Sequence, residues 1–212
     1  MRLTRFALLA LGALLLFAPA TTSAFNAKQL KRAEEAIAKA IEEKNIPGAV
    51  LLAGTREKVL FTKAYGNRAV EPSEEPMTED TIFDLASLSK PIGCATSVLI
   101  LIDRGKINLT DSVAKHLPEF GNNGKEKITV EMLLRHHGGL IPDNPMKDYV
   151  GAPEEMIDRV MKLKTTSEPG TKFAYTDVGF IVLGELVKRV SGKPLETFAK
   201  EEIFTPLGMK DT

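Results

Sequence analysis

The segment PIGCATSVLILIDRG, residues 91–105, constrains the fold of this chain most strongly, because it is apolar on almost every side. A helix without a polar face is stable only where other elements cover it all round. We therefore expect a helix over 91–105 that ends at Gly105 and lies in the middle of a domain. Immediately before it stands FDLASLSKP, residues 83–91, which carries Ser87 and Lys90 three positions apart.

Apolar patterns elsewhere predict one small sheet and a series of helices. The apolar runs 49–53 and 59–66 flank the polar loop GTREK, an arrangement typical of a β-hairpin. The polar stretch 67–80 is expected to cross the surface without forming a strand. Helices are predicted over 27–44, 129–136, 153–163, 178–190 and 194–203.

The charge balance argues against partners that are recognised through charge alone. The chain has 28 basic and 28 acidic side chains in 212 residues, so its formal net charge is zero. Proteins that bind nucleic acid or anionic membrane surfaces usually carry a basic excess. We therefore expect no nucleic-acid partner, and the hydrophobic content of 43% indicates a packed globular core.

The first 24 residues have the composition of a secretory signal peptide. MRLTR is basic, FALLALGALLLFAPA is apolar and TTSA ends in small residues, which is the order of regions in such a peptide. An uncleaved membrane anchor is the alternative. We expect residues 1–24 to be removed, which would leave residues 25–212 as one domain of a secreted or periplasmic protein with no stable membrane span.

Cysteine and histidine give no support for a disulfide or a metal site. Cys94 is the only cysteine and lies in an apolar stretch, so we expect it to be buried as a small hydrophobic side chain. His136 and His137 are adjacent in the chain, so their side chains are expected to point to different faces. The segment HHGGL is interpreted as a helix end with a glycine turn, and no metal is expected.

Ser87 and Lys90 have the spacing of a nucleophile and its activating partner. Side chains three positions apart share one face of a helix, so the lysine amine would lie beside the serine hydroxyl. A lysine desolvated by an apolar helix would have a lowered pKa and could accept the hydroxyl proton. The alternative is that Ser87 only caps the helix. A second Ser-x-x-Lys, from Ser112 to Lys115, is interpreted as the exposed first turn of a short helix in a polar segment, where nothing would desolvate the lysine.

The segment FAYTDVGFIVLG, residues 173–184, adds Tyr175 in a turn before an apolar helix. A phenol has a pKa near 10 and can act as a base beside a cation, which Lys90 would supply. Together with FDLASLSKP, LLRHHGGL and EEIFTPLGMKDT, this segment resembles the serine β-lactamase and penicillin-binding-protein superfamily. The resemblance is greatest to the branch of class C β-lactamases, DD-peptidases and related esterases, and it extends to residue 212.

This resemblance implies an α/β fold of the α+β, two-lobed kind, with an antiparallel sheet flanked by helices and a mostly helical lobe. It also implies that Ser87 is acylated and that Lys90 and Tyr175 form the general-base pair, with the residue that takes the proton left open. The substrate would be a small ester, peptide or β-lactam, and neither a metal nor an organic cofactor is implied.

Asp177 departs from the pattern of the superfamily, whose Tyr-x-Asn is here Tyr175-Thr176-Asp177. An asparagine amide can donate a hydrogen bond to a substrate carbonyl, whereas an ionised aspartate can only accept one. Asp177 is therefore a candidate substrate-binding residue that favours a simple ester or a peptide-like substrate. It could also cap the helix predicted over 178–190.

The third motif of the superfamily, Lys-Thr-Gly or His-x-Gly on a late strand, does not occur after Tyr175. The resemblance therefore implies that the strands and helix that complete the sheet are missing after residue 212. The function that the sequence favours is a serine hydrolase that works through an acyl-enzyme on Ser87. The alternative is a catalytically silent domain that binds cell-wall peptide or a partner, or an inactive truncated product.

Overall fold

The computed structural model describes residues 27–212. The predicted signal peptide, residues 1–24, lies outside the described residues. After Ile82 the chain divides into two compact units.

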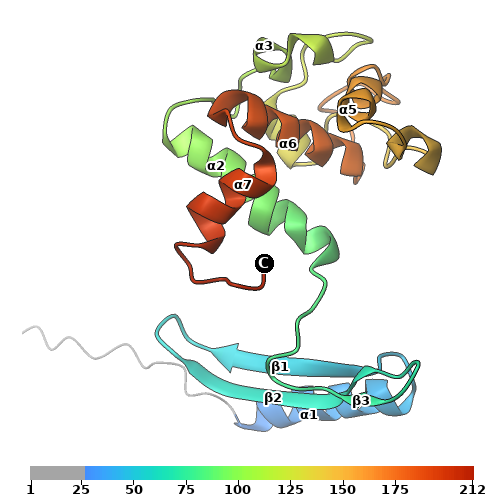
Figure 1. Cartoon of the computed structure of the whole chain (residues 1–212), viewed down its shortest axis with the longest axis vertical. Helices are drawn as coiled ribbons and strands as arrows, with labels where there is room; N and C mark the ends of the chain where they lie inside the picture. The colour runs from blue at the N-terminus through green and yellow to red at the C-terminus, as the bar shows by residue number, and fades with distance from the viewer. Residues whose placement is uncertain (1–26) are drawn as a thin grey trace, which may run out of the picture. The chain divides into compact units, whose positions relative to one another are not determined.

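The first unit is a three-stranded antiparallel sheet with one helix packed on it (Figure 1). The predicted hairpin is confirmed, with Gly48 opposite Gly66 and an irregular register between Ala53 and Gly54. The strands follow one another in the order β1-β2-β3. The elements are α1 (Ala27–Glu42), β1 (Gly48–Gly54), β2 (Val59–Ala69) and β3 (Glu75–Pro76).

Two polar contacts tie α1 to the sheet. The Lys63 ammonium and the Tyr65 hydroxyl on β2 each donate to Glu34 Oε1 over 2.8 Å. The hydrogen bond from Lys63 lowers the pKa of the Glu34 carboxyl. The same face of α1 carries half-buried apolar side chains at Leu30, Ile37 and Ile41. The helix is therefore fixed by a central carboxylate and a partly buried apolar stripe.

The third strand shows that the predicted surface crossing over 67–80 was wrong. β2 continues to Ala69 and pairs with β3, and Arg68 Nε donates to Glu75 Oε2 over 2.9 Å. An edge strand this short, with a proline and charged side chains, is held by backbone hydrogen bonds and not by apolar alternation. The hydrophobic pattern therefore carries no signal for it.

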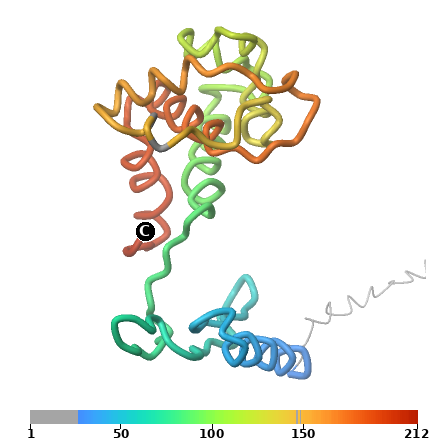
Figure 2. The backbone as a smooth tube through the Cα atoms, turned by 90° about the vertical axis from the view of Figure 1, so that its right-hand side faces the viewer, coloured from blue at the N-terminus to red at the C-terminus, as the bar shows by residue number. Residues whose placement is uncertain are grey.

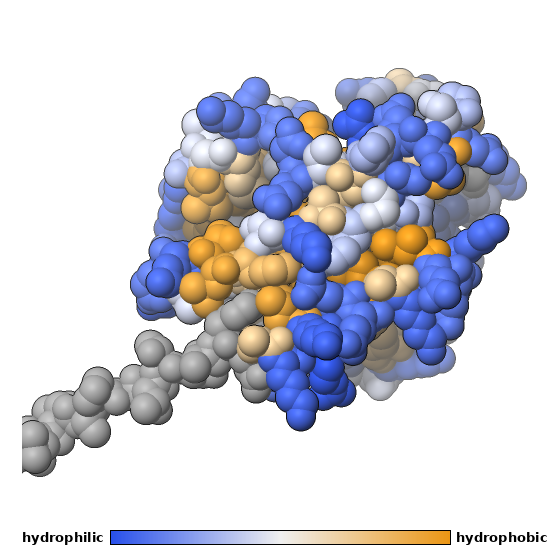
Figure 3. Space-filling model, turned by 90° about the horizontal axis from the view of Figure 1, so that it is seen from below, coloured by the Kyte–Doolittle hydropathy of each residue, from blue (hydrophilic) through white to orange (hydrophobic). Residues whose placement is uncertain are grey.

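None of the side chains in residues 27–82 is fully buried. The space-filling view shows hydrophobic surface between hydrophilic side chains (Figure 3). The large apolar side chains exposed in this unit are Leu52, Val59, Leu60, Val70 and Ile82. The hydrogen-bonded ladder and partial burial, and not a closed core, are the features that hold this unit together.

The second unit, residues 83–212, is helical and contains the buried core. The predicted helix over 91–105 is confirmed as a π-helical turn followed by an α-helix, and Gly105 follows it with φ +65°. This continuous stretch consists of η1 (Ala86–Leu88), η2 (Lys90–Ala95) and α2 (Thr96–Asp103).

The four downstream helices predicted from the sequence are also confirmed. They are α4 (Val130–Leu134), α5 (Pro153–Met161), α6 (Asp177–Ser191) and α7 (Leu195–Ala199), the last continuing into η5 (Lys200–Phe204). The short helix expected at Ser112–Lys115 is confirmed as α3 (Val113–His116). Two other short elements were not expected, because one turn is too short to show a hydrophobic period. They are η3 (Pro118–Phe120) and η4 (Met146–Tyr149).

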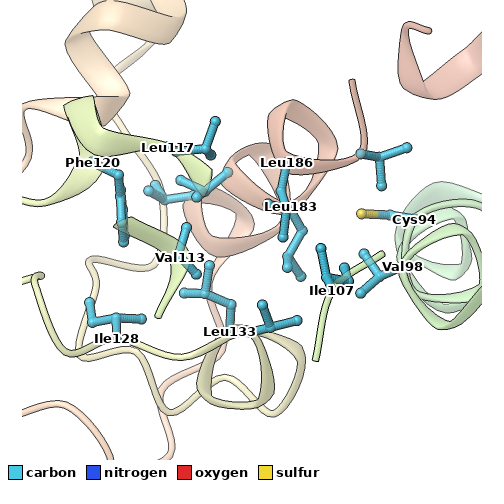
Figure 4. Close-up of a cluster of buried hydrophobic side chains, with 14 of the residues drawn as sticks. Cys94, Val98, Ile107, Val113, Leu117, Phe120, Ile128, Leu133, Leu183 and Leu186 are labelled. Carbon is cyan, nitrogen blue, oxygen red and sulfur yellow. The ribbon is translucent and has the colours of Figure 1, made fainter. Parts of the chain in front are cut away.

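The core is built from helices that are far apart in the sequence. Val98 of α2, Leu133 of α4 and Leu183 of α6 are completely buried and belong to one cluster (Figure 4). In both views of the backbone, α2 and α7 lie side by side (Figures 1 and 2). Cys94 belongs to the same cluster with 5% of its surface exposed, which confirms its predicted burial.

The segment Ala86–Asp103 is long and apolar enough to cross a membrane by length and composition alone. The core helix of a soluble protein passes the same test. Here Ser97, Val98 and Leu101 are buried against neighbouring helices, so the apolar character of this segment is explained at least in part by the core.

Helix α6 is apolar on two faces. One face is buried in the core and consists of Val178, Gly179, Val182, Leu183, Leu186 and Val187. The other face carries Phe180, Ile181 and Gly184, which are only half-buried. A helix that is covered on both sides needs apolar residues on both, so the second face of α6 has the composition of a covered surface without being fully covered.

We expect the two faces to differ in their contribution to stability. Leu183→Ala should lower the free energy of unfolding by about 2–5 kcal/mol, because it opens a cavity in the core. Ile181→Ala should cost only about 1–2 kcal/mol, because less apolar surface is withdrawn from water at this position. Urea denaturation of the two variants measures the difference, and equal losses would contradict the assignment of the faces.

Candidate active site

Ser87 lies on a tight turn that its neighbours hold in an unusual backbone conformation. Ala86 has φ +44°, a region that residues with a β-carbon rarely adopt. The Ala86 N–H donates to Asp84 Oδ1 over 2.8 Å, and the Leu88 N–H donates to the Leu85 carbonyl over 2.9 Å. Ser87 does not cap a helix, because Leu85 occupies the cap position of η1. Ser87 is exposed, and its hydroxyl is not engaged in capping.

Lys90 is the first residue of the π-helical turn η2, and Pro91 follows it. Its Nζ donates to Ser87 Oγ over 3.3 Å, which confirms that the Ser-x-x-Lys spacing places the amine beside the hydroxyl. Only 16% of the Lys90 side chain is exposed. Single π-turns inside helices are frequent at functional sites, because they re-aim a side chain without ending the helix.

The ammonium of Lys90 also contacts the two predicted residues at the start of α6. Lys90 Nζ lies 2.5 Å from Asp177 Oδ1 as an ion pair and 5.1 Å from the centre of the Tyr175 ring. Asp177 Oδ1 is buried, yet within the described residues no partner meets it with hydrogen-bond geometry. The structure thus brings Ser87, Lys90, Tyr175 and Asp177 together around one ammonium group.

The start of α6 is fixed by Thr176, and not by Asp177 as the capping interpretation suggested. Thr176 Oγ1 accepts the Gly179 N–H over 3.3 Å and donates to the Ile141 carbonyl over 2.6 Å. The Asp177 N–H donates to the Pro142 carbonyl over 2.8 Å. Because the threonine is the cap, the Asp177 carboxylate is free to face Lys90.

His136 completes the site and was not identified from the sequence. Its ring stacks on the ring of Tyr175 with a centroid distance of 4.5 Å and an interplanar angle of 29°. Its Nδ1 accepts the Thr176 N–H over 3.1 Å, and its carbonyl accepts the Ala174 N–H over 2.9 Å. His136 therefore holds the segment that carries Tyr175 in place. The neighbouring His137 does not take part, because its Nδ1 contacts the Arg135 carbonyl.

The pKa shifts at this site separate the roles of the phenol and the amine. Hydrogen bonds with Ser87 and then with Lys90 lower the pKa of Tyr175 below its usual value. Burial acts to lower the pKa of Lys90, but the close contacts with the Asp177 carboxylate and the Tyr175 hydroxyl outweigh it and the pKa is raised. The expected lowering of the Lys90 pKa was therefore wrong, because the sequence does not show that a carboxylate folds back onto the amine.

The other sequence signals behave as structural features. Ser112 Oγ donates to the Glu126 carbonyl, while Lys115 turns away to Asp111 Oδ1 at 2.8 Å. Burial raises the pKa of the Cys94 thiol to about 12, which makes it a poor nucleophile. Between residues 27 and 212, no group of three or more His, Cys, Asp or Glu side chains is placed to hold a metal ion.

The comparison with protein families gives the class to which this fold and site belong. The family model described as Beta-lactamase matches residues 33–212. The chain therefore belongs to the beta-lactamase family, as the resemblance in its motifs predicted. The predicted fold class is confirmed as well, because solved structures of this family superpose on the chain with TM-scores of about 0.7.

Three similar proteins carry names that describe different reactions. An N-acetylmuramyl-L-alanine amidase of Bacillus subtilis (strain 168) is 31% identical over 212 aligned residues, which cover 91% of this chain and 48% of the amidase. A class C beta lactamase from Rhodobacter sphaeroides is 29% identical, with a TM-score of 0.69 over 83% of this chain and 48% of that one. EstCE1, a hydrolase with promiscuous acyltransferase activity, is 26% identical, with a TM-score of 0.73 over 84% of this chain and 51% of that one. The chain thus spans about half the length of the curated relatives it matches.

The backbone of Ala86 gives a test of how Ser87 is held. Ala86→Val should lower the free energy of unfolding by about 1–3 kcal/mol, because a β-branched side chain is strained at positive φ. Ala86→Gly should stay within about 1 kcal/mol of the wild type, because glycine adopts this conformation freely. Urea denaturation compares the two, and equal stability of both variants would contradict a positive φ at this position.

Proposed function

We propose that this protein is a serine hydrolase that transfers the acyl group of an ester or amide to Ser87. The observation that carries the proposal is the contact between the exposed Ser87 hydroxyl and the Lys90 ammonium, beside a tyrosine with a lowered pKa. The names of the relatives support the same reaction class, since amidases and beta-lactamases cleave a carbonyl–nitrogen bond and a hydrolase with acyltransferase activity transfers an acyl group.

In the proposed first step, Tyr175 is the general base. Its deprotonated oxygen accepts the proton of Ser87 while Oγ attacks the substrate carbonyl carbon. The bond from that carbon to the leaving oxygen or nitrogen then breaks, and the leaving group takes the proton from Tyr175. Water subsequently attacks the ester on Ser87, which releases the acid and restores the hydroxyl.

Lys90 has a different role in this scheme. Its raised pKa keeps it as an ammonium, so it stabilises the phenolate of Tyr175 and donates to Ser87 Oγ. Asp177 in turn keeps Lys90 charged and in place through the 2.5 Å ion pair. The lysine therefore acts as a fixed positive charge, which matters more in a partly desolvated site than in water.

Asp177 also bears on the substrate. A carboxylate oxygen accepts hydrogen bonds and repels a substrate carbonyl or carboxylate. We therefore propose that simple esters and donor-bearing amides are better substrates than β-lactams, whose side-chain carbonyl would meet an acceptor here.

A serine-reactive fluorophosphonate probe tests the nucleophile. Wild-type protein should be labelled, and Ser87→Ala should not be. The matched control is Ser112→Ala, which removes the serine of the second Ser-x-x-Lys and should be labelled like the wild type. Absence of labelling in the wild type, or equal labelling of Ser87→Ala, would reject the proposal in favour of a catalytically silent binding domain.

The pH dependence of labelling tests the division of roles. The rate should rise as pH increases through the pKa of Tyr175, which lies below 10, because the base must lose its proton. It should fall as pH passes the pKa of Lys90, which lies above 10.5, because the ammonium is then lost.

The variant Asp177→Asn should move the falling limb to lower pH. Burial opposes the charged form of Lys90, so the pKa depends on the carboxylate that this variant removes. Asp158→Asn is the control, since Asp158 pairs with Lys162 on the exposed face of α5. An unchanged falling limb in Asp177→Asn would show that Asp177 does not set the charge of Lys90.

A further inference from the structure

A cavity of about 610 Å³ opens beside Lys90 and Asp177 and runs along α6. Its volume lies within the range of pockets that bind small molecules. Lys90 lines the cavity, and its Nζ is 3.3 Å from Ser87 Oγ. The cavity therefore begins one side chain away from the candidate nucleophile.

The floor of the cavity is the second apolar face of α6. Asp177, Phe180, Ile181, Gly184, Glu185 and Lys188 line it in sequence order along the helix. From residue 177 to residue 188 an α-helix rises about 16 Å. The hollow is therefore a groove that starts at the site and follows the helix for three turns.

The walls of the groove are mostly apolar, with Ser89 and Glu196 as the polar exceptions. Pro153 and Ile157 of α5 lie on one side, and Cys94 of η2 and Leu195 of α7 lie on the other. Figure 1 shows α6 between α5 and α7. A second cavity of about 330 Å³ shares Ser89, Cys94, Leu195 and Glu196 with the first, so the two cavities are adjacent.

Gly184 widens the groove at its middle. A glycine inside a helix costs about 1 kcal/mol of stability relative to alanine. A β-carbon at this position would meet Leu195 Cδ2 at 3.3 Å and would project into the hollow. The helix thus carries a costly residue at the point where the groove needs room.

The lining favours hydrocarbon over peptide as an occupant. The backbone groups in the middle of a helix are already hydrogen-bonded within it, so they offer nothing to a peptide chain. Of the buried side-chain atoms without a hydrogen-bond partner in residues 27–212, only Asp177 Oδ1 belongs to this lining, and it is paired with the Lys90 ammonium. The charges at the far end, Glu185 and Lys188, pair with each other.

We propose that the groove along α6 binds the hydrocarbon chain of an acyl ester, so that the substrate is an ester of a medium-length aliphatic acid. The inference rests on the proposed function, because it places the scissile carbonyl at Ser87. The chain then passes Lys90 and Asp177 and lies against Phe180, Ile181 and Gly184. The leaving alcohol stays outside the groove.

Hydrolysis of p-nitrophenyl esters tests this proposal on the purified protein. Each buried methylene group favours binding roughly fourfold. The octanoate ester should therefore have a kcat/KM at least tenfold above that of the acetate. Comparable values for the two esters would overturn the groove and leave the serine hydrolase intact.

Filling the groove with a larger side chain should remove the preference for octanoate over acetate. Gly184→Val should lower the octanoate-to-acetate ratio of kcat/KM at least fivefold, and Ile157→Trp should do the same from the opposite wall. Arg189→Val is the matched control, because it introduces the same side chain on an exposed position of the same helix. A wild-type ratio in both groove variants, or an equal fall in Arg189→Val, would overturn the proposal.

A binding measurement separates this inference from the proposed function. Octanamide should bind to Ser87→Ala protein, as detected by saturation-transfer NMR, and acetamide should not. Adding Gly184→Val to that protein should abolish the octanamide signal. If no ester is hydrolysed but octanamide binds in this way, hydrocarbon binding in the groove is supported and the proposed hydrolase activity is rejected. If octanamide does not bind, the groove falls.

Discussion

The ion pair between Lys90 and Asp177 is the interaction on which the rest of the site depends. It joins the turn that carries Ser87 to Asp177, the first residue of α6. Tyr175 lies two residues before this helix. The Lys90 ammonium has little exposure and three polar neighbours, so its charge is retained by contacts and not by water. Removing the Asp177 carboxylate would leave the partly buried Lys90 cation without its main stabilising partner. The charge at position 177 therefore matters more for the site than a helix-capping role would.

Helix α6 performs several tasks at once. One face supplies Leu183 and Leu186 to the core, and the other lines the groove beside the site. Its first residue holds Lys90, while Thr176 fixes where the helix begins. Because one rigid element supplies the core, the ion pair and the groove, the position of a bound chain would be tied to the position of the candidate base.

The sequence predicted the parts of this structure that depend on long apolar periods and on a local spacing. The helix after Ser87, the hairpin and the proximity of Ser87 and Lys90 follow from such patterns. The sequence could not show β3, because this strand is held by backbone hydrogen bonds. It also could not show the contact of His136 with Tyr175, because folding brings together two segments that are distant in the chain. The raised pKa of Lys90 was missed for a similar reason, since a local pattern shows burial but not the partner that a distant helix supplies.

The bond from the Thr176 N–H to His136 Nδ1 has a consequence for the chemistry of the site. A ring nitrogen can accept an amide hydrogen only while it carries no proton itself, so the backbone dictates the tautomer with hydrogen on Nε2. Burial, together with the nearby Lys90 charge, lowers the pKa of His136 and preserves this neutral form. The neutral imidazole thus positions the segment that carries Tyr175, through the ring stack and the hydrogen bond from Thr176. Because protonation of Nδ1 would break that hydrogen bond, His136 is poorly suited to carry a proton.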